Sequence, residues 1–398
     1  MTLEEIRLLD TPALRDAVDA NLERDPNAIA LDKRLPHAAL VATQVKYLQR
    51  ARRKLPTYFA ARAIIPSLAF EQASSEAAAA CKTWSGNRCI DLTCGLGVDT
   101  LALSKAFGEV ISIERDAVVA ETARINFARM GATNITVVND TAEVFLQRFA
   151  AEGRTADLIY ADPDRRSDTG RKLVLLEECR PDIRALLPLL RRLTPRIAVK
   201  LSPLFDVAEA FRIFGDRSRV RAISQHGECK ELLVETGDAV TVPAVGVTVL
   251  DRGEAWFATG ETPPDRPVGP FEPPYRYLLM PDVALRKTRT TERYAATALP
   301  DAFAAPDDGY LFLNRLPDRP PLGRLFEIRS CERFDPARLK RSLRERGIRS
   351  AELHLHRCPL GAAALARRLG IREGGEVCLA FTGIGDTLWA IELKTITL

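Results

Sequence analysis

The apolar positions of the first 80 residues recur with the period of an α-helix. Leu14, Val18 and Leu22 are four residues apart, and apolar residues recur at helical spacing again over 40–48. Side chains at this spacing lie on one face of a helix. The alternation of apolar and polar residues that is typical of a strand is missing from this segment. The pattern therefore predicts an N-terminal helical domain over residues 1–80.

Between residues 85 and 255, short apolar runs alternate with helical stretches. Such runs are typical of strands buried on both faces, and their alternation with helices is typical of a parallel sheet covered by helices. We therefore expect an α/β domain with a Rossmann-like sheet over residues 81–259. The predicted strands are 88–92, 109–114, 135–138, 157–161 and 196–201, and the predicted helices are 99–107, 116–130, 141–150, 176–193 and 204–214.

Two details at the end of this domain stay open. Pro181 and Pro188 interrupt the helix predicted over 176–193, which is therefore expected as one helix or as two pieces. Two further strands are predicted over 230–235 and 245–250, and they are candidates for an antiparallel pair.

The C-terminal part follows a segment that is rich in proline. Residues 260–274 contain six prolines and predict a linker. Residues 275–398 then predict a small α+β domain with the order β-α-β-α-β-β. Its predicted elements are 325–329, 335–346, 351–356, 361–369, 376–381 and 388–394.

The composition is that of an ordinary globular protein, with 46% hydrophobic and 28% charged residues. No run of apolar residues is long enough for a membrane span, and the N-terminus does not resemble a signal peptide. The eight cysteines form no C-x-x-C pair, and the chain has only four histidines. We therefore expect reduced thiols in a cytoplasmic protein, with no metal site and no membrane partner. Cys94 is interpreted as a small buried side chain.

Candidate chemistry begins at a glycine-rich turn after the first predicted strand. Asp91 lies in that strand, which ends at Leu92. Gly95 and Gly97 follow, and the next helix is predicted near Asp99. Glycines let the backbone turn sharply and approach a ligand closely. The position of the turn between a strand and a helix is the context that a nucleotide-binding loop requires.

Two carboxylates at later strand ends identify the type of cofactor. Glu114 ends the second strand, where it can accept both hydroxyls of a ribose, and Asp140 follows the third strand, where it can meet an adenine amino group. A nicotinamide dinucleotide is disfavoured because Thr100 occupies the third glycine position of its fingerprint and Asp91 would repel a pyrophosphate. Asp91 could instead attract an ammonium group. Together these residues indicate S-adenosylmethionine.

The motif D-L-T-C-G-L-G, which includes Thr93, followed one strand later by E-R-D, resembles class I S-adenosylmethionine-dependent methyltransferases. Three further features resemble the bacterial methyltransferases that carry a THUMP-like C-terminal domain. They are the stretch 71–76, the loop 162–166 and the C-terminal β-α-β-α-β-β unit. This resemblance implies a THUMP-like domain over 275–398 and an enzyme that acts on RNA.

The loop after the fourth strand is the candidate catalytic loop, because ligands of open parallel sheets lie beyond the carboxyl ends of the strands. Asp162 and Pro163 match the start of the D/N-P-P-aromatic motif of enzymes that methylate exocyclic amines. Asp164 and Arg165 depart from that motif, which weakens the inference of amine methylation, although a guanidinium can also stack on a base. Asp162 is the expected acceptor for the target group.

Basic residues supply the candidate substrate contacts. Arg166 and Lys200 are expected near the crevice, with a structural ion pair as the alternative for each. On the helix predicted over 335–346, Leu339 and Leu343 share one face. The arginines on the rest of this helix could meet phosphate, and the alternative is a solvated surface. These residues are Arg338, Arg341 and Arg344.

The sequence therefore predicts an S-adenosylmethionine-dependent methyltransferase that modifies a nucleotide in tRNA or rRNA. One alternative is a non-catalytic RNA-binding protein with a vestigial methyltransferase fold. A second is a methyltransferase of a protein or small molecule.

Overall fold

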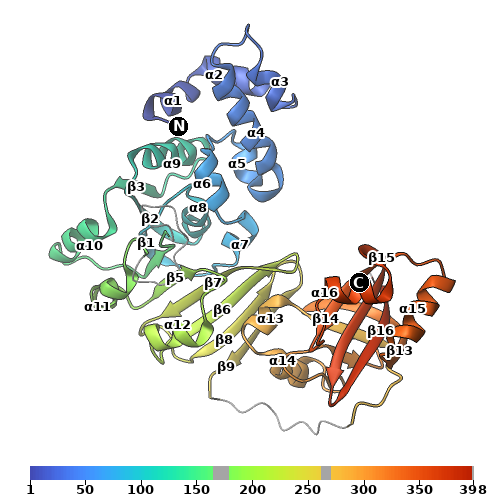
Figure 1. Ribbon diagram of the computed structural model, residues 1–398. Coiled ribbons are helices and arrows are strands. Elements are labelled where there is room, and N and C mark those ends of the chain that lie inside the picture. The colour runs from blue at the N-terminus through green and yellow to red at the C-terminus, as the bar shows by residue number, and fades with distance from the viewer. Residues whose placement is uncertain (165–178, 261–269, 397–398) are drawn as a thin grey trace. The chain divides into compact units, whose positions relative to one another are not determined.

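A computed structural model describes residues 1–164, 179–260 and 270–396 of the chain (Figure 1). The chain folds into two compact units, which are described separately. The first comprises residues 1–219 and 232–242, and the second comprises 220–231 and 243–398. The sequence predicted boundaries at 80 and at the linker 260–274. Contacts instead join the N-terminal helices to the α/β sheet, and the second unit begins before the linker, of which residues 261–269 lie outside the described residues.

Seven helices form the N-terminal part of the first unit, as the helical periodicity predicts. Many begin at a proline or a capping side chain, which fixes where each helix starts. The helices are α1 (Leu3–Leu9), α2 (Pro12–Ala20), α3 (Pro26–Ala30), α4 (Ala38–Lys54), α5 (Pro56–Ala60), α6 (Ser67–Gln72) and α7 (Glu76–Ala80).

The sheet of the first unit has the strand order β3-β2-β1-β4-β5-β7. The first five strands are parallel, and β7 runs antiparallel to β5. The strands are β1 (Gly86–Asp91), β2 (Phe107–Glu114), β3 (Ile135–Asn139), β4 (Leu158–Ala161), β5 (Ile197–Leu201) and β7 (Glu228–Thr236). The helices are α8 (Val98–Ser104), α9 (Ala117–Arg129), α10 (Ala142–Ala151), α11 (Ile183–Leu193) and α12 (Val207–Phe214). The predicted Rossmann-like arrangement is confirmed.

Two local predictions differ from the structure. The helix predicted from 176 begins at Ile183, after Pro181, and continues through Pro188, while residues 176–178 lie outside the described residues. The strands predicted over 230–235 and 245–250 do not pair with each other. Instead, β7 pairs with β5, and β8 (Ala244–Val249) forms a hairpin with β9 (Gly253–Ala258). The sequence analysis missed β9 and also β6 (Ser218–Gln225).

The second unit contains a seven-stranded sheet with the order β11-β12-β10-β13-β16-β15-β14. The β-α-β-α-β-β order predicted after residue 325 is present as β13 (Gly323–Arg333), α15 (Pro336–Glu345), β14 (Ser350–His356), α16 (Ala362–Leu369), β15 (Arg372–Ile384) and β16 (Thr387–Thr395). Further elements that the sequence analysis missed are β10 (Tyr277–Pro281), α13 (Val283–Lys287), α14 (Thr291–Ala298), β11 (Phe303–Ala304) and β12 (Leu311–Leu313). None of the described helices of the chain is long and apolar enough to span a bilayer.

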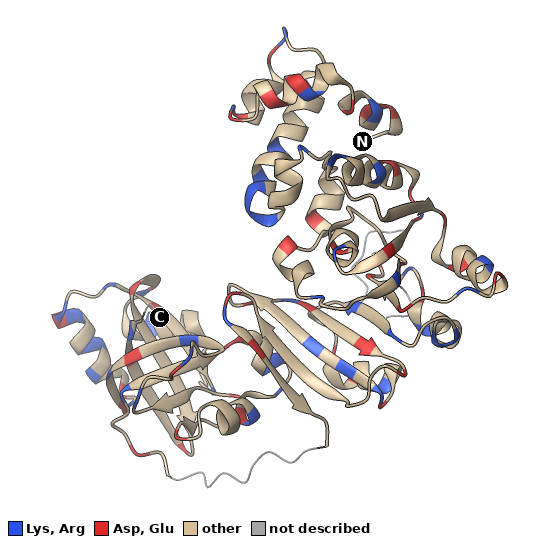
Figure 2. Ribbon diagram, turned by 180° about the vertical axis from the view of Figure 1, so that it is seen from behind, with Lys and Arg blue, Asp and Glu red and all other residues tan. Residues whose placement is uncertain are grey.

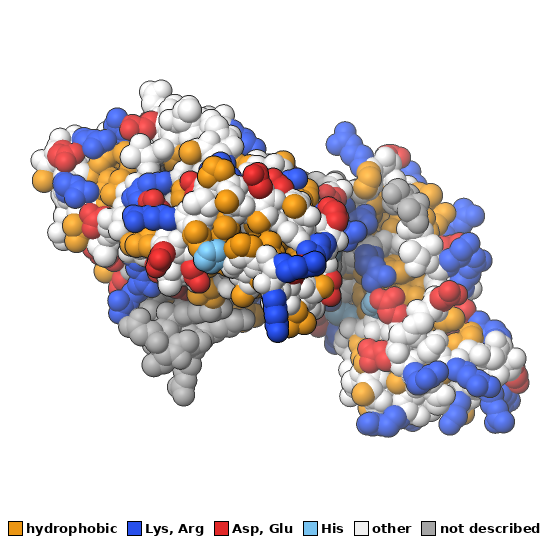
Figure 3. Space-filling view, turned by 90° about the horizontal axis from the view of Figure 1, so that it is seen from above, with side chains coloured by type: hydrophobic (Ala, Val, Ile, Leu, Met, Phe, Trp, Pro, Cys, Tyr) orange, Lys and Arg blue, Asp and Glu red, His pale blue; other side chains and the backbone are white. Residues whose placement is uncertain are grey.

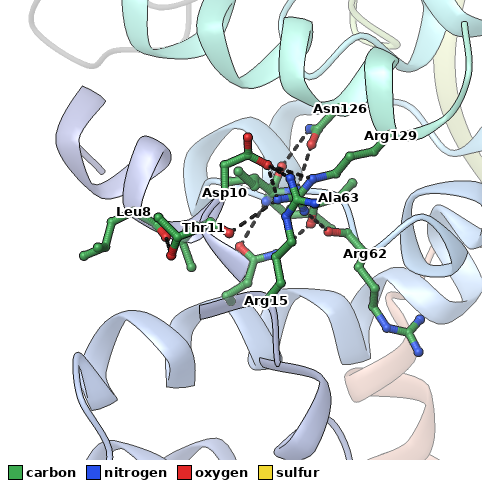
Figure 4. A network of polar contacts seen from close by, with 12 residues as sticks. Leu8, Asp10, Thr11, Arg15, Arg62, Ala63, Asn126 and Arg129 are labelled. Atoms are coloured by element: carbon green, nitrogen blue, oxygen red, sulfur yellow. Dashed lines mark hydrogen bonds and ion pairs between the residues drawn. The ribbon is translucent and has the colours of Figure 1, made fainter. Parts of the chain in front are cut away.

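Polar contacts anchor the N-terminal helices to α9 (Figure 4). The buried Asn126 side chain accepts a hydrogen bond from the Ile64 N–H and donates one to the Ile64 carbonyl, each at 2.8 Å. Arg129 bonds to Asp10 at 2.7 Å and to the carbonyl oxygen of Arg62. Apolar side chains of the helices share one core with Phe127. The N-terminal helices therefore hold a fixed position beside the sheet.

We expect Asn126→Ala to lower the free energy of unfolding by about 1–3 kcal/mol, because it leaves two buried backbone groups of Ile64 without partners. The midpoint of the urea transition, followed by circular dichroism, measures the effect. Glu121→Ala on the same helix removes only an exposed ion pair with Arg124 and should cost less than about 0.5 kcal/mol. Equal effects of the two substitutions would contradict the anchoring role of Asn126.

Candidate functional site

A pocket of about 1160 Å³ lies beyond the carboxyl ends of the parallel strands of the first unit. The loops after four strands line it, with residues 92–99, 113–116, 140–143 and 162–164. A second wall comes from residues 66, 68, 69 and 71–74 of the N-terminal helical part. Of the predicted cofactor residues, the structure brings together Thr93, Gly95, Gly97, Glu114 and Asp140 around this pocket.

The glycine-rich loop takes a shape that other residues could not adopt without strain. Gly95 and Gly97 have φ angles of +55° and +87°, in the left-handed region. A Cβ atom on Gly97 would lie 2.4 Å from the Phe127 ring, so this glycine also permits close packing of the loop against α9. A Cβ on Gly95 would meet no atom within 4 Å. The loop thus presents open backbone to the pocket.

Asp91 lies beneath the loop and is not among the residues that line the pocket, so its attraction of a cofactor ammonium, directly or through water, stays a prediction. Its carboxylate accepts hydrogen bonds from the Thr93 N–H at 3.0 Å and from the Thr100 hydroxyl at 2.5 Å. Burial raises the pKa of Asp91 to about 7, although these two hydrogen bonds lower it. Asp91 therefore fixes the loop from inside the protein.

Glu114 stands at the end of β2, as the sequence predicted. Its two carboxylate oxygens accept hydrogen bonds from the N–H groups of Gly95 and Asp116, each at 2.9 Å. Burial raises the pKa of Glu114, and the two N–H donors oppose that rise. Asp140 also lines the pocket, where its carboxylate accepts from the Thr141 N–H at 2.8 Å and pairs with Arg148 at 3.4 Å.

Asp162 is held on two sides at the end of β4. Its N–H donates to the Thr93 hydroxyl at 2.6 Å, and its carboxylate pairs with Lys200 Nζ at 2.5 Å. Lys200 is only 7% exposed, so the structure favours the ion-pair alternative over a contact with substrate phosphate. Pro163 lines the pocket beside Asp162, while Arg165 and Arg166 lie outside the described residues.

A second buried lysine forms a cluster that the sequence analysis missed. The carboxylate of Asp99, at the start of α8, accepts from Lys82 Nζ at 2.5 Å, from the Tyr160 hydroxyl at 2.9 Å and from the Ser74 hydroxyl at 3.4 Å. Burial raises the pKa of Asp99, but the charges of Lys82 and Lys200 outweigh it and lower the pKa overall. The stretch 71–76 was one available signal, because it contains Ser74.

The predicted phosphate contacts of the second unit lie on the exposed side of α15, and Leu343 packs into the core. Figure 3 shows many Lys and Arg side chains on the surface of the molecule. Arg338 pairs with Glu332 at 3.1 Å, whereas Arg341 and Arg344 have no ion pair with any described residue. The sequence predicted no metal site. Glu352, His354 and Cys378 do place ligand atoms within 4.8 Å of one another, but Arg324 already neutralises the Glu352 carboxylate at 3.1 Å.

Two segments of the chain match known families. Residues 70–178 match the family described as Conserved hypothetical protein 95, and residues 323–394 match the family described as THUMP domain-like. The second match confirms the predicted THUMP-like character of the C-terminal domain.

Curated relatives and a solved structure extend these matches. The chain is 37% identical over 87 residues to the 23S rRNA (uracil(1939)-C(5))-methyltransferase RlmD of Xylella fastidiosa. The aligned segment covers 20% of this chain and 18% of that protein. The chain is 34% identical over 85 residues to an uncharacterized RNA methyltransferase of Enterococcus faecalis. This second aligned segment covers 21% of this chain and 18% of that protein. The chain thus spans about a fifth of the length of these relatives.

The crystal structure of a protein from Porphyromonas gingivalis W83, designated a methyltransferase, superimposes with a TM-score of 0.76 at 24% identity. The match covers 99% of this chain and 98% of that protein, so the two share the fold over their whole lengths. The two curated relatives and the THUMP domain-like match confirm the predicted resemblance to methyltransferases with a THUMP-like C-terminal domain. The solved structure confirms the fold.

The raised pKa of Asp91 predicts a dependence of stability on pH. Between the ordinary pKa of 3.8 and about 7, the folded chain keeps a proton that the unfolded chain has released. Stability should therefore fall as the pH rises through this window. Asp91→Asn lacks this titration, so wild type should lose up to about 4 kcal/mol relative to the variant between pH 4 and pH 8. Urea unfolding across this range measures it, and parallel curves would refute the assignment.

The pairing of Lys200 with Asp162 can be measured by a double-mutant cycle. Lys200→Met leaves the Asp162 carboxylate beside an apolar side chain, and Asp162→Asn leaves the Lys200 ammonium buried without its anion. We expect the double variant to be more stable than the sum of the single effects by about 0.5–3 kcal/mol in urea unfolding. Additive effects would mean that the two side chains do not stabilise each other.

Proposed function

We propose that this chain is an S-adenosylmethionine-dependent methyltransferase that modifies a nucleotide in RNA. The observation that carries the proposal is the Glu114 carboxylate, held beside the glycine-rich loop by two backbone N–H groups. Each oxygen accepts one N–H and keeps a further acceptor site. These sites suit the two hydroxyls of a ribose, as the acid at the end of the second strand does in dinucleotide folds.

The charge of the pocket favours a cationic cofactor over a pyrophosphate. Nine carboxylates but only two arginines, Arg115 and Arg180, are among its described lining residues. S-adenosylmethionine carries a positive sulfonium and no phosphate, so this negative field attracts it and repels a dinucleotide. The lining carboxylates are Glu71, Asp99, Glu114, Asp116, Asp140, Glu143, Asp162, Asp164 and Asp182.

The remaining lining residues fit the adenine end of the same cofactor. Val118, Val119 and Ala142 give the pocket an apolar wall near Asp140, which suits a flat base with one polar edge. Thr100, which replaces the third glycine of the dinucleotide fingerprint, is buried and bonded to Asp91. Its side chain therefore belongs to the support of the loop.

In the proposed reaction, the side chains mainly align the target group with the methyl group, and strong acids or bases are not required. The bound cofactor supplies a methyl group on sulfur. Thr93 and Lys200 hold Asp162 at the pocket, and the second carboxylate oxygen of Asp162 remains as an acceptor for a hydrogen bond from the target group. Correct placement of the reacting groups can lower a barrier by about 7–11 kcal/mol. Burial raises the pKa of the Cys94 thiol, which makes a covalent role for this residue unfavourable.

Three observations support RNA as the substrate. Both curated relatives are described as RNA methyltransferases. The C-terminal residues match a THUMP domain-like family. Arg338, Arg341 and Arg344 of α15 are exposed, as contacts to phosphate require. Arg165 and Arg166 remain predictions for the same role, and a cytoplasmic location is part of the proposal.

Calorimetry with S-adenosylmethionine and S-adenosylhomocysteine tests the cofactor site. We expect wild type to bind with a Kd near 1 μM, about −8 kcal/mol, and Glu114→Ala to bind at least tenfold more weakly. Glu143→Ala, which removes a carboxylate from the same pocket, should change the affinity less than about threefold, because Glu143 is exposed and solvent screens its charge. Failure of wild type to bind either ligand would refute the methyltransferase proposal.

Transfer of a labelled methyl group to total RNA then tests the substrate, with Asp162→Asn as the variant expected to lose turnover while keeping the cofactor. Cofactor binding without transfer to RNA or protein would favour the non-catalytic alternative. Transfer that survives ribonuclease treatment of a cell extract would favour a protein or small-molecule substrate.

A further inference from the structure

The C-terminal half of α4 carries a basic face on the first unit. Lys46, Arg50, Arg53 and Lys54 are separated by four, three and one residues, which places them along one side of the helix. The opposite side is buried in the core through Val41, Val45, Leu48 and Ala51. Figure 2 shows the cationic residues gathered where α4 meets α5. We call these four side chains the α4 basic face.

The α4 basic face reaches the rim of the pocket through α6. The Arg50 guanidinium lies 5.0 Å from the centre of the Phe70 ring and pairs with Glu71. Lys54 Nζ lies 4.6 Å from the same ring and donates to the Phe70 carbonyl at 2.6 Å. Glu71 itself lines the pocket, as do Leu68 and Gln72 of the same helix. One turn of α6 therefore separates the basic side chains from the pocket.

The two surfaces have opposite charge, and this difference limits where a nucleic acid can lie. The acidic lining of the pocket admits a base but repels the phosphates on either side of it. Lys46 and Arg53 are exposed and have no ion pair with any described residue. They are therefore available to neutralise phosphates outside the pocket.

We propose that the α4 basic face binds the phosphodiester backbone of the RNA strand whose target nucleotide enters the pocket. This inference rests on the proposed function, since it assumes that the substrate is RNA. It assigns to the N-terminal helical part a contact with the flanking nucleotides, separate from the arginines of α15 in the second unit. A base that enters the pocket leaves its stack, and contacts to the neighbouring phosphates hold the strand in that position.

The test compares two double variants of the full chain that lose the same charge. Lys46→Gln/Arg53→Gln alters the α4 basic face. Lys105→Gln/Arg192→Gln removes one exposed lysine and one exposed arginine near the amino-terminal edge of the sheet, opposite the pocket. The probe is a fluorescent single-stranded RNA of about 20 nucleotides, with its affinity measured by anisotropy over a series of salt concentrations. S-adenosylmethionine binding by calorimetry monitors the pocket.

We expect the α4 variant to bind the RNA about 3–10-fold more weakly than wild type. The negative slope of log K against log salt should become shallower by about 1.4, because two phosphate contacts on a single strand are lost. The control should keep both values, and both variants should bind the cofactor like wild type. Equal RNA binding by wild type and the α4 variant, or equal loss in both variants, would overturn the inference. Failure of wild type to bind the cofactor would refute the proposed function. The two failures are distinguishable, because the RNA affinities of the α4 variant and the control are measured separately from cofactor binding.

Discussion

The hydrogen bonds of the buried Asp91 carboxylate are the interactions on which the glycine-rich loop depends. It accepts from Thr93 at the start of the loop and from Thr100 in the following helix, and thereby fixes both ends of the glycine turn. Glu114 holds the middle of the turn through Gly95. The backbone between these two carboxylates has little freedom, so the Glu114 oxygens and the open surface of Gly95 keep their positions without a ligand.

The distribution of charge around the pocket follows from the requirement that buried charged groups have partners of opposite charge. Lys82 and Lys200 are withdrawn from the pocket and neutralise Asp99 and Asp162, because a buried ammonium requires a partner. The pocket is left with an excess of carboxylates. In the proposed function, this negative field would suit a sulfonium and an uncharged base and would keep phosphates outside the pocket. The exposed cations of α4 and α15 are the proposed contacts for those phosphates.

The N-terminal helices are part of the unit that contains the pocket. Tyr58 donates to the Leu96 carbonyl in the glycine-rich loop at 3.0 Å, and Asn126 binds the backbone of Ile64. Ser74 contributes to the Asp99 cluster at the pocket wall. The shape of the pocket is therefore determined in part by residues that precede the first strand.

Periodicity and glycine placement in the sequence determined the five parallel strands, the N-terminal helices, the glycine-rich loop and Glu114, because these depend on local spacing and on the order of strand ends. Only the tertiary structure decided which way Asp91 faces, that Lys200 pairs with Asp162, and that Lys82, Asp99 and Tyr160 meet. It also added β10 and β12 to the C-terminal sheet. These features join residues far apart in the chain, and local spacing carries no information about such contacts.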